Sequence, residues 1–384
     1  MLIKRPIQIH PTILPAVVGL FMLVFLFSQL PRSKIQHPPA LNVGAGPSNI
    51  LYDVFNETLG FEKIFVISLP SRTDRRDGMT LAAAMSNIEI VFIDGVKGDE
   101  VPNKAIPKFK NRVKDGEIGS WRAQMNAIQQ LKEQLYDFAR SSNALTQPLL
   151  NSDPPKSADP TYPIPPDAKT IPADISFNSL PSTALPLHSP YGDKWGLLWI
   201  GHMGMNVPTP SSPSPEKIPR GRIVRTSDNT VPQIQHLESF YNDFAERFGY
   251  ENHTRLVHHA TKAIGSAGYA VTQATARKLL YAVALDEVNE GLDHMLSEYC
   301  EGRKGGWKHA DCLTTNPALF NRHRSAGWMG ADGDIQSDYE TDFRETAQTD
   351  NVRWSTRLNM EVLLEGGTEF VDQWPDELLE SDTL

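Results

Sequence analysis

Two short apolar runs with a helical segment between them stand out in the first third of the chain. Lys63–Leu69 is rich in β-branched and aromatic residues and ends at a proline, and Ile88–Ile93 ends at Asp94-Gly95. Both runs have the length and composition of β-strands. Asp74–Met85, between them, has helical composition. Strand, helix and strand in this order predict a right-handed βαβ unit, and therefore an α/β fold class.

The apolar pattern predicts further elements along the chain. Trp195–Gly201 is a continuous apolar run that favours a buried strand, and Leu237–Phe248 and Thr272–Val288 have helical patterns. Between Ile118 and Phe138 the apolar positions recur every three or four residues, at Ile118, Trp121, Met125, Ile128, Leu131, Leu135 and Phe138. This spacing predicts one amphipathic helix of about six turns.

Ile13–Leu30 carries no charged residue and is long enough to span about 27 Å as a helix. A cleaved signal peptide is the alternative, but the residues after the run lack the small-residue pattern of a cleavage site. We therefore expect a single-pass type II anchor in the Golgi or endoplasmic reticulum membrane, with residues 1–12 in the cytosol. The rest would face the lumen, where the sequons at Asn56 and Asn252 become glycosylation sites.

Composition divides the remainder of the chain. Residues 31–60 have little apolar periodicity and predict a stem. One large domain is expected at 61–364, with a proline-rich surface excursion at 147–190 in which eleven prolines fall within 43 residues and no packed element is expected. Residues 365–384 hold seven acidic residues and no basic one, which predicts a solvated acidic tail.

Charge and cysteine content narrow the possible functions. The chain has 37 basic and 46 acidic residues, a formal charge of −9, which disfavours nucleic acid as a partner. Cys300 and Cys312 are the only cysteines. On the oxidising side of a membrane they favour one intramolecular disulfide. A zinc site that adds His294 and His309 is the alternative, although the spacing matches no common zinc pattern.

Basic residues cluster in the loop after the first predicted strand. Ser71–Arg76 contains three arginines, at the carboxyl end of a strand and the start of a helix. Ligands bind at this edge in open α/β sheets, and guanidinium groups suit a diphosphate. Asp94 ends the second predicted strand, where a carboxylate can accept hydrogen bonds from a nucleoside. A solvated basic turn and a turn-forming Asp-Gly pair are the alternatives.

Candidate groups for catalysis and metal binding lie farther along the chain. Asp293 could take a proton from an acceptor hydroxyl, or could cap a helix. Asp332 and Asp334 have the D-x-D spacing that places both carboxylates on one face of a strand. His323 could join them around a manganese-like ion, and a surface histidine is the alternative.

Motifs in a fixed order along the chain resemble those of family 25 glycosyltransferases, the lipooligosaccharide type, in the form met in filamentous fungi. The motifs are IFVISLPSRTDRR, FIDG, GEIGSWRAQMNA, LLWIGH, GSAGYAVT, DHML, CLTTNPALFNRHR, GDI and VRWSTRLN. They extend from about residue 61 to residue 360.

The resemblance implies a GT-A-like nucleotide-sugar domain with an open mixed sheet. Such a domain transfers a hexose, commonly galactose, from a UDP-sugar to a glycan or glycoprotein, with a divalent metal and inversion at C1. By position in the motifs, Arg72, Asp74, Arg75 and Arg76 match the nucleotide-binding loop, with Ser68 at the strand end before it. Glu117 matches the acid that opens the family's next helix.

One departure from the family affects the expected activity. The family has an apolar strand that ends in an acidic metal-binding cluster, whereas here Gln129-Gln130 run directly into Leu131–Leu135. One central strand is therefore expected to be missing, and Asp332, Asp334 and His323 are the remaining metal candidates. Three interpretations stay open: a glycosyltransferase, a non-catalytic lumenal protein that binds a nucleotide or a partner, and an incomplete gene model.

Overall fold

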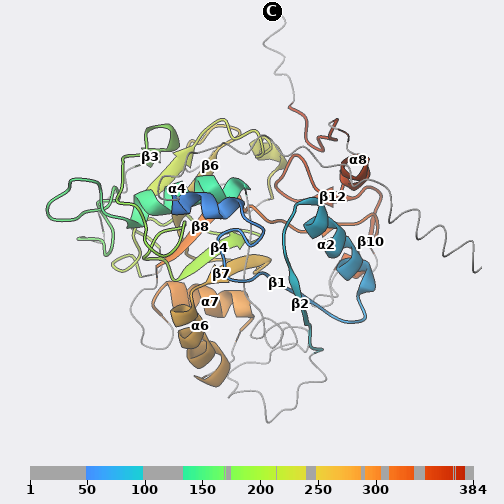
Figure 1. The fold of residues 1–384 in the computed structure, drawn as a ribbon, viewed down its shortest axis with the longest axis horizontal. Helices are drawn as coiled ribbons and strands as arrows, with labels where there is room; N and C mark the ends of the chain where they lie inside the picture. Colours follow the sequence, from blue (N-terminus) through green and yellow to red (C-terminus); the bar gives the residue numbers. More distant parts are fainter. Residues whose placement is uncertain are drawn as a thin grey trace, which may run out of the picture. The chain divides into compact units, whose positions relative to one another are not determined.

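The computed structural model describes residues 49–97, 133–167, 169, 174–212, 214–238, 248–286, 290–303, 311–332, 342–365, 367 and 369–376 (Figure 1). These residues belong to one compact unit, Pro47–Leu384. None of their helices is both long and apolar enough to cross a membrane. The predicted anchor at 13–30, most of the predicted helix at 118–138 and most of that at 237–248 lie outside the described residues.

The predicted βαβ unit is confirmed. β1 (Phe65–Ser68) and β2 (Val91–Asp94) are parallel, and α2 (Thr73–Met85) connects them. The register pairs Ser68 with Asp94, so both strands end at the same level. The loop before α2 and the end of β2 consequently lie at one edge of this small sheet (Figure 1).

The described residues also form a six-stranded mixed sheet, in the order β3-β5-β6-β8-β4-β7. Its strands are β3 (Asp174–Ser176), β4 (Leu197–Gly201), β5 (Arg222–Arg225), β6 (Arg255–His259), β7 (Gly268–Val271) and β8 (Cys312–Asn316). β4 pairs in parallel with β8, and β3 with β5, while the other pairs are antiparallel. Every residue of β4, β6 and β8 is buried, which confirms the buried strand predicted from Trp195–Gly201.

Helices cover both faces of this sheet. Leu198 and Ile200 of β4 pack into one apolar cluster with α4 (Glu133–Thr146) and the 3₁₀ helix η1 (Ile50–Phe55). Leu197 and Trp199 point to the other face and pack with α6, the following π-helix and α7. These elements span Gln273–Leu279, Leu280–Asp286 and Leu292–Cys300. The first two confirm the helix predicted near 272–288.

Smaller elements complete the described fold. β9 (His323–Arg324) pairs with β12 (Gln348–Thr349), and β10 (Gly327–Trp328) pairs with β11 (Phe343–Arg344). Short helical turns occur at Phe177–Ser179 (η4), Ile234–His236 (η5), Met329–Asp332 (η8) and Met360–Leu364 (α8).

The two sheets remain separate within the described part of the chain. There, β1 pairs with β2 alone, and β7, at the end of the larger sheet, pairs with β4 alone. The mixed α/β class with an open mixed sheet is confirmed. The missing central strand stays a prediction.

Predictions for three segments need correction. The predicted stem, 31–60, ends inside the fold, because Val54 and Leu59 are fully buried in the core. The proline-rich segment 147–190 is not free of packed structure: it supplies β3, and Thr161 is fully buried. The sequence did not predict β3, because a strand of three residues is too short to show an alternating pattern among the prolines.

The third correction concerns the predicted acidic tail, part of which contacts the domain. Asp372 forms an ion pair with Arg353 at 2.5 Å, and the Trp374 ring stacks on His236. Val371 donates its backbone N–H to Asn359. Residues 369–376 are therefore packed against the domain, because their acids meet arginine rather than solvent alone.

The predicted disulfide is confirmed. Cys300, at the end of α7, is bonded to Cys312, at the start of β8, and both are fully buried. The bond joins a covering helix to a central strand, and it excludes the alternative zinc site at these cysteines.

Loss of the disulfide should destabilise the protein. A bond that closes a loop of about 13 residues contributes roughly 3 kcal/mol in the chain-entropy model. The double variant Cys300→Ala/Cys312→Ala should lose about this much free energy of unfolding in urea, and a non-reduced digest of the wild type should contain the linked peptides. Two free thiols in the wild type would contradict the assignment.

Two buried histidines predict a pH dependence of stability. Burial lowers the pKa of His202 to about 4 and that of His258 to about 3. The unfolded chain, with a pKa near 6.5, binds more protons than the folded one, so stability falls as pH falls through about 6.5. Burial raises the pKa of Asp311 to about 6, so this carboxyl group adds stability as pH falls below 6. It offsets only part of the stability that the two histidines remove.

Urea unfolding at pH 7.5 and pH 5.0 tests this. Each histidine should lower the free energy of unfolding by on the order of 2 kcal/mol as the pH falls from 6.5 to 5. The control variant His188→Asn, at an exposed histidine, should keep the wild-type pH dependence. Equal stability at both pH values would contradict the prediction.

Candidate functional site

The ends of β1 and β2 are joined by one arginine of the predicted loop. Arg76 Nη2 donates to the backbone oxygen of Ser68 at 2.8 Å and forms an ion pair with Asp94. The Arg76 guanidinium also lies over the Phe92 ring, 5.3 Å from its centroid. Three of the predicted nucleotide-binding residues, Ser68, Arg76 and Asp94, are therefore brought together at the carboxyl edge.

A second pair lies at the first turn of α2. Arg72 Nε and Nη2 donate to the two carboxylate oxygens of Asp74, at 3.0 and 2.9 Å. The hydrogen bond with Arg72 is the main reason that the pKa of Asp74 falls to about 2. Asp74 is therefore ionised at any physiological pH and holds the Arg72 fork at the strand end. Arg75, next to this pair, is exposed.

Arg357 is a basic residue near this site that was not among the predicted site residues. Its guanidinium lies directly on α2 at Gly78, with Nη1 2.9 Å from where a Cβ on that glycine would stand. The interior glycine in a helical pattern is the sequence signal for a close approach of this kind. Together, the strand ends, the start of α2 and Arg357 form a surface, called here the arginine edge, that carries four guanidinium groups.

The arginine edge has the chemistry of an anion site. Guanidinium groups bind phosphate oxygens through paired hydrogen bonds, and the start of a helix adds a favourable dipole. Asp94 at the strand end offers a carboxylate to hydroxyl or N–H donors. A nucleoside diphosphate has both kinds of complementary group, phosphate oxygens for the arginines and hydroxyl or N–H donors for Asp94.

The other predicted residues do not join this edge in the described part of the chain. Asp293, in the first turn of α7, accepts the backbone N–H of Gly265 at 2.7 Å through Oδ2. It thereby holds a turn in which Gly265 has a φ of +80°. Its predicted role as a base stays a prediction, and its contact is that of a residue that fixes a loop.

The predicted metal ligands are only partly described. His323 lies on β9, with Nδ1 3.0 Å from the Thr349 hydroxyl. Asp332 ends η8, while its side chain, Asp334 and Glu117 lie outside the described residues. Among the side chains that are described, no group of three or more His, Cys, Asp or Glu forms a metal site.

The two sequons differ in structure. Asn56 is exposed, and its side-chain oxygen accepts from the backbone N–H and the hydroxyl of Thr58. Asn252 is also exposed, but its oxygen accepts from the backbone N–H of Ile234, and Thr254 is buried. Glycosylation at either position stays a prediction.

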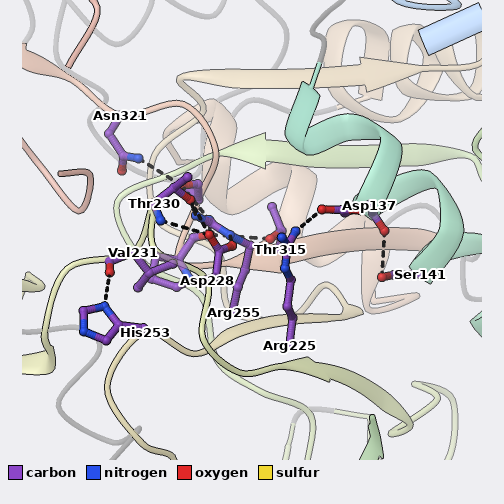
Figure 2. A network of polar contacts seen from close by, with 12 residues as sticks. Asp137, Ser141, Arg225, Asp228, Thr230, Val231, His253, Arg255, Thr315 and Asn321 are labelled. Atoms are coloured by element: carbon purple, nitrogen blue, oxygen red, sulfur yellow. Dashed lines mark hydrogen bonds and ion pairs between the residues drawn. The ribbon is translucent and has the colours of Figure 1, made fainter. Parts of the chain in front are cut away.

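A polar network lies at the carboxyl end of β5 (Figure 2). Arg255, at the start of β6, donates from Nε to Asp228 at 2.7 Å, and the two side chains are only 6% and 4% exposed. The other carboxylate oxygen of Asp228 accepts the Thr230 hydroxyl, and Arg255 Nη1 donates to the backbone oxygen of Pro317. Arg225 reaches from β5 to Asp137 on α4.

A small cavity adjoins this network, between α4 and the sheet. Its charged lining groups are already paired with each other, so desolvation of Arg255 and Asp228 is compensated within the protein. The network holds the loops after β5 and β8 together. We therefore regard it as a structural support rather than the candidate site.

A known family matches the part of the chain that holds most of the arginine edge. Residues 61–150 match the profile of glycosyltransferase family 25, described as an LPS biosynthesis protein. The matched segment contains β1, α2, β2 and α4, and so most of the arginine edge. No curated protein and no solved structure matches the chain significantly. The resemblance seen in the motifs is confirmed over residues 61–150, and the match indicates a role in glycosyl transfer.

The buried pair should matter for stability far more than the exposed one. Arg255→Met leaves Asp228 buried without its partner and should cost about 3–5 kcal/mol of unfolding free energy. Arg72→Met, which breaks the exposed pair with Asp74, should cost less than about 1 kcal/mol. Urea unfolding of both variants measures the difference, and equal costs would show that the Arg255 network is not a support.

Proposed function

We propose that the arginine edge binds the diphosphate of a nucleotide sugar and that the protein is a glycosyltransferase of the family 25 type. The observation that carries this proposal is the convergence of Ser68, Arg72, Asp74, Arg76 and Asp94 at one edge, within the segment that matches the family. The motif resemblance supports UDP-hexose, most simply UDP-galactose, as the donor. A glycan or glycoprotein hydroxyl is the proposed acceptor.

The proposed reaction is a displacement at C1 of the sugar. The acceptor oxygen forms the new bond to C1 as the bond from C1 to the phosphate oxygen breaks, and the diphosphate leaves with the electron pair. The guanidinium groups of the arginine edge offset the negative charge that develops on the diphosphate. Asp293 is the proposed base for the acceptor proton.

A divalent metal would supply further charge neutralisation in this family-type reaction. The described residues do not show a set of ligands that fits such an ion, since His323 contacts Thr349 and no acidic cluster forms near it. The side chain of Asp332 and all of Asp334 lie outside the described residues, so a manganese-like ion held by Asp332, Asp334 and His323 stays a proposal, and the arginines are proposed to stabilise the leaving group with it.

A second function is favoured by one observation in the sequence. The chain runs from Gln129-Gln130 directly into Leu131–Leu135, where the family has its acidic strand. Without those carboxylates the protein would retain nucleotide binding and lack efficient transfer. Nucleotide binding is common to both functions, and transfer separates them.

Location is proposed on separate grounds. The uncharged run at 13–30 supports a type II anchor, and the buried disulfide suits the oxidising lumen of the Golgi or endoplasmic reticulum. Protection of the domain from protease in intact microsomes would support this topology, and digestion without detergent would reverse it.

Calorimetry on the full-length protein in detergent tests the site. Wild type should bind UDP, and the double variant Arg72→Ala/Arg75→Ala should bind it about 10- to 100-fold more weakly, because each charged hydrogen bond contributes roughly 1.5 kcal/mol. Lys156→Ala, at an exposed lysine elsewhere, is the control. Unchanged affinity in the double variant would place the nucleotide elsewhere.

The same preparation separates the two functions. Release of UDP from UDP-galactose with manganese, dependent on Asp293, would support the transferase. UDP binding without turnover would support the non-catalytic function, and we expect turnover to be low because the sequence lacks the family's acidic segment after Gln130. Absence of UDP binding by the wild type would contradict both.

A further inference from the structure

Arg357 is held against α2 by a specific steric arrangement. Nη1, Cζ and Nη2 of Arg357 lie 2.9, 3.3 and 3.6 Å from the position that a Cβ on Gly78 would occupy. A methyl group at this position would therefore make the guanidinium shift, at low cost because it is the end of a flexible side chain. Gly78 lies inside a 13-residue helix, where glycine costs about 1 kcal/mol relative to alanine. This unfavourable glycine stands at the position where Arg357 contacts the helix.

The position of Gly78 relates Arg357 to the arginine edge. Gly78 follows Arg75 by three residues and Asp74 by four, so the three positions share one face of α2. The glycine is five residues after Thr73, or about 7.5 Å along the helix axis. A diphosphate at the start of α2 is within reach of an arginine side chain that lies on this face.

The segment that carries Arg357 is fixed on both sides. Arg353 forms ion pairs with Asp372 and Asp376. Asn359 donates from its side chain to the backbone oxygens of Ser355 and Val371. The backbone at Arg357 is consequently anchored, while the Arg357 side chain is exposed.

Arg357 also differs from its neighbours in its pairing. Arg72 is bonded to Asp74, and Arg76 to Asp94. Within the described part of the chain, Arg357 forms no ion pair and no hydrogen bond through its side chain. A cation that is anchored, exposed and uncompensated beside an anion site is suited to bind the anion itself.

We propose that Arg357 is a further phosphate-binding residue, which contacts the diphosphate of the nucleotide from the second turn of α2. This inference rests on the proposed function, because it extends the same site. It assigns a role to the segment Val352–Asn359, which is far in sequence from the loop. It also explains why α2 has glycine at position 78.

Two variants test the contact in different ways. Arg357→Ala removes the cation, and Gly78→Ala leaves the cation in the sequence but shifts its position on α2. Thr80→Ala is the matched control, because it adds the same helix-favouring residue on the opposite face of α2. Thermal unfolding should show that all three variants remain folded, with Gly78→Ala and Thr80→Ala as stable as the wild type or more so.

Calorimetry with UDP and with uridine gives the result. Arg357→Ala should weaken UDP binding about tenfold, and Gly78→Ala, which only shifts the guanidinium, about two- to threefold, with Thr80→Ala unchanged. None of the variants should change the affinity for uridine, which has no phosphate.

The outcome separates this inference from the proposed function. Wild-type UDP affinity in both Arg357→Ala and Gly78→Ala, with weakened binding in Arg72→Ala/Arg75→Ala, would overturn the role of Arg357 and leave the proposed site intact. Equal loss of UDP and uridine would show a general disturbance of the site and would also overturn it. Absence of UDP binding by the wild type would overturn both proposals.

Discussion

The parallel pairing of β1 with β2 is the constraint on which the candidate site depends. Parallel strands need a crossover connection, and here α2 provides it, so the loop before α2 and the end of β2 meet at one edge. Arg76 then fixes that edge by bonding both Ser68 and Asp94. The meeting of Arg76 and Asp94 at the edge follows from this topology, because the register pairs Ser68 with Asp94 at the ends of the two strands.

The larger sheet packs with the start of the small one, because Ile64, just before β1, lies in the same apolar cluster as Leu198 and Ile200 of β4. Its central strands are buried on both faces, and the disulfide between Cys300 and Cys312 joins one of them to a covering helix. On the opposite face, Arg255 and Asp228 hold two loops together through a buried ion pair. Both interactions are buried, whereas the ion pairs Arg72–Asp74 and Arg76–Asp94 at the arginine edge are partly exposed to solvent.

The local sequence pattern was sufficient to predict elements whose structure depends mainly on neighbouring residues. The β-branched runs at 63–69 and 88–93 specify β1 and β2, and Trp195–Gly201 specifies the buried β4. The disulfide was predictable because the chain has only two cysteines. The cluster of Ser68, Arg76 and Asp94 was predictable because a βαβ unit brings strand ends together whatever packs around it.

Features that depend on distant contacts were not predictable in this way. The packing of Trp374 on His236 makes part of an acidic segment ordered, although its composition is that of a solvated tail. β3 is too short to show a pattern among prolines. Arg357 lies on α2 through tertiary packing, and the sequence carried only an indirect signal of that contact, the glycine at position 78.

Hydrogen exchange measured by mass spectrometry, with and without UDP, tests the location of the site most directly. The account predicts that UDP slows exchange at the amides of residues 69–78 and around Asp94, with a smaller effect near Arg357 and none in β5 or β6. Protection centred on Arg225, Asp228 and Arg255 instead would contradict it, because the ligand would then occupy the cavity under α4.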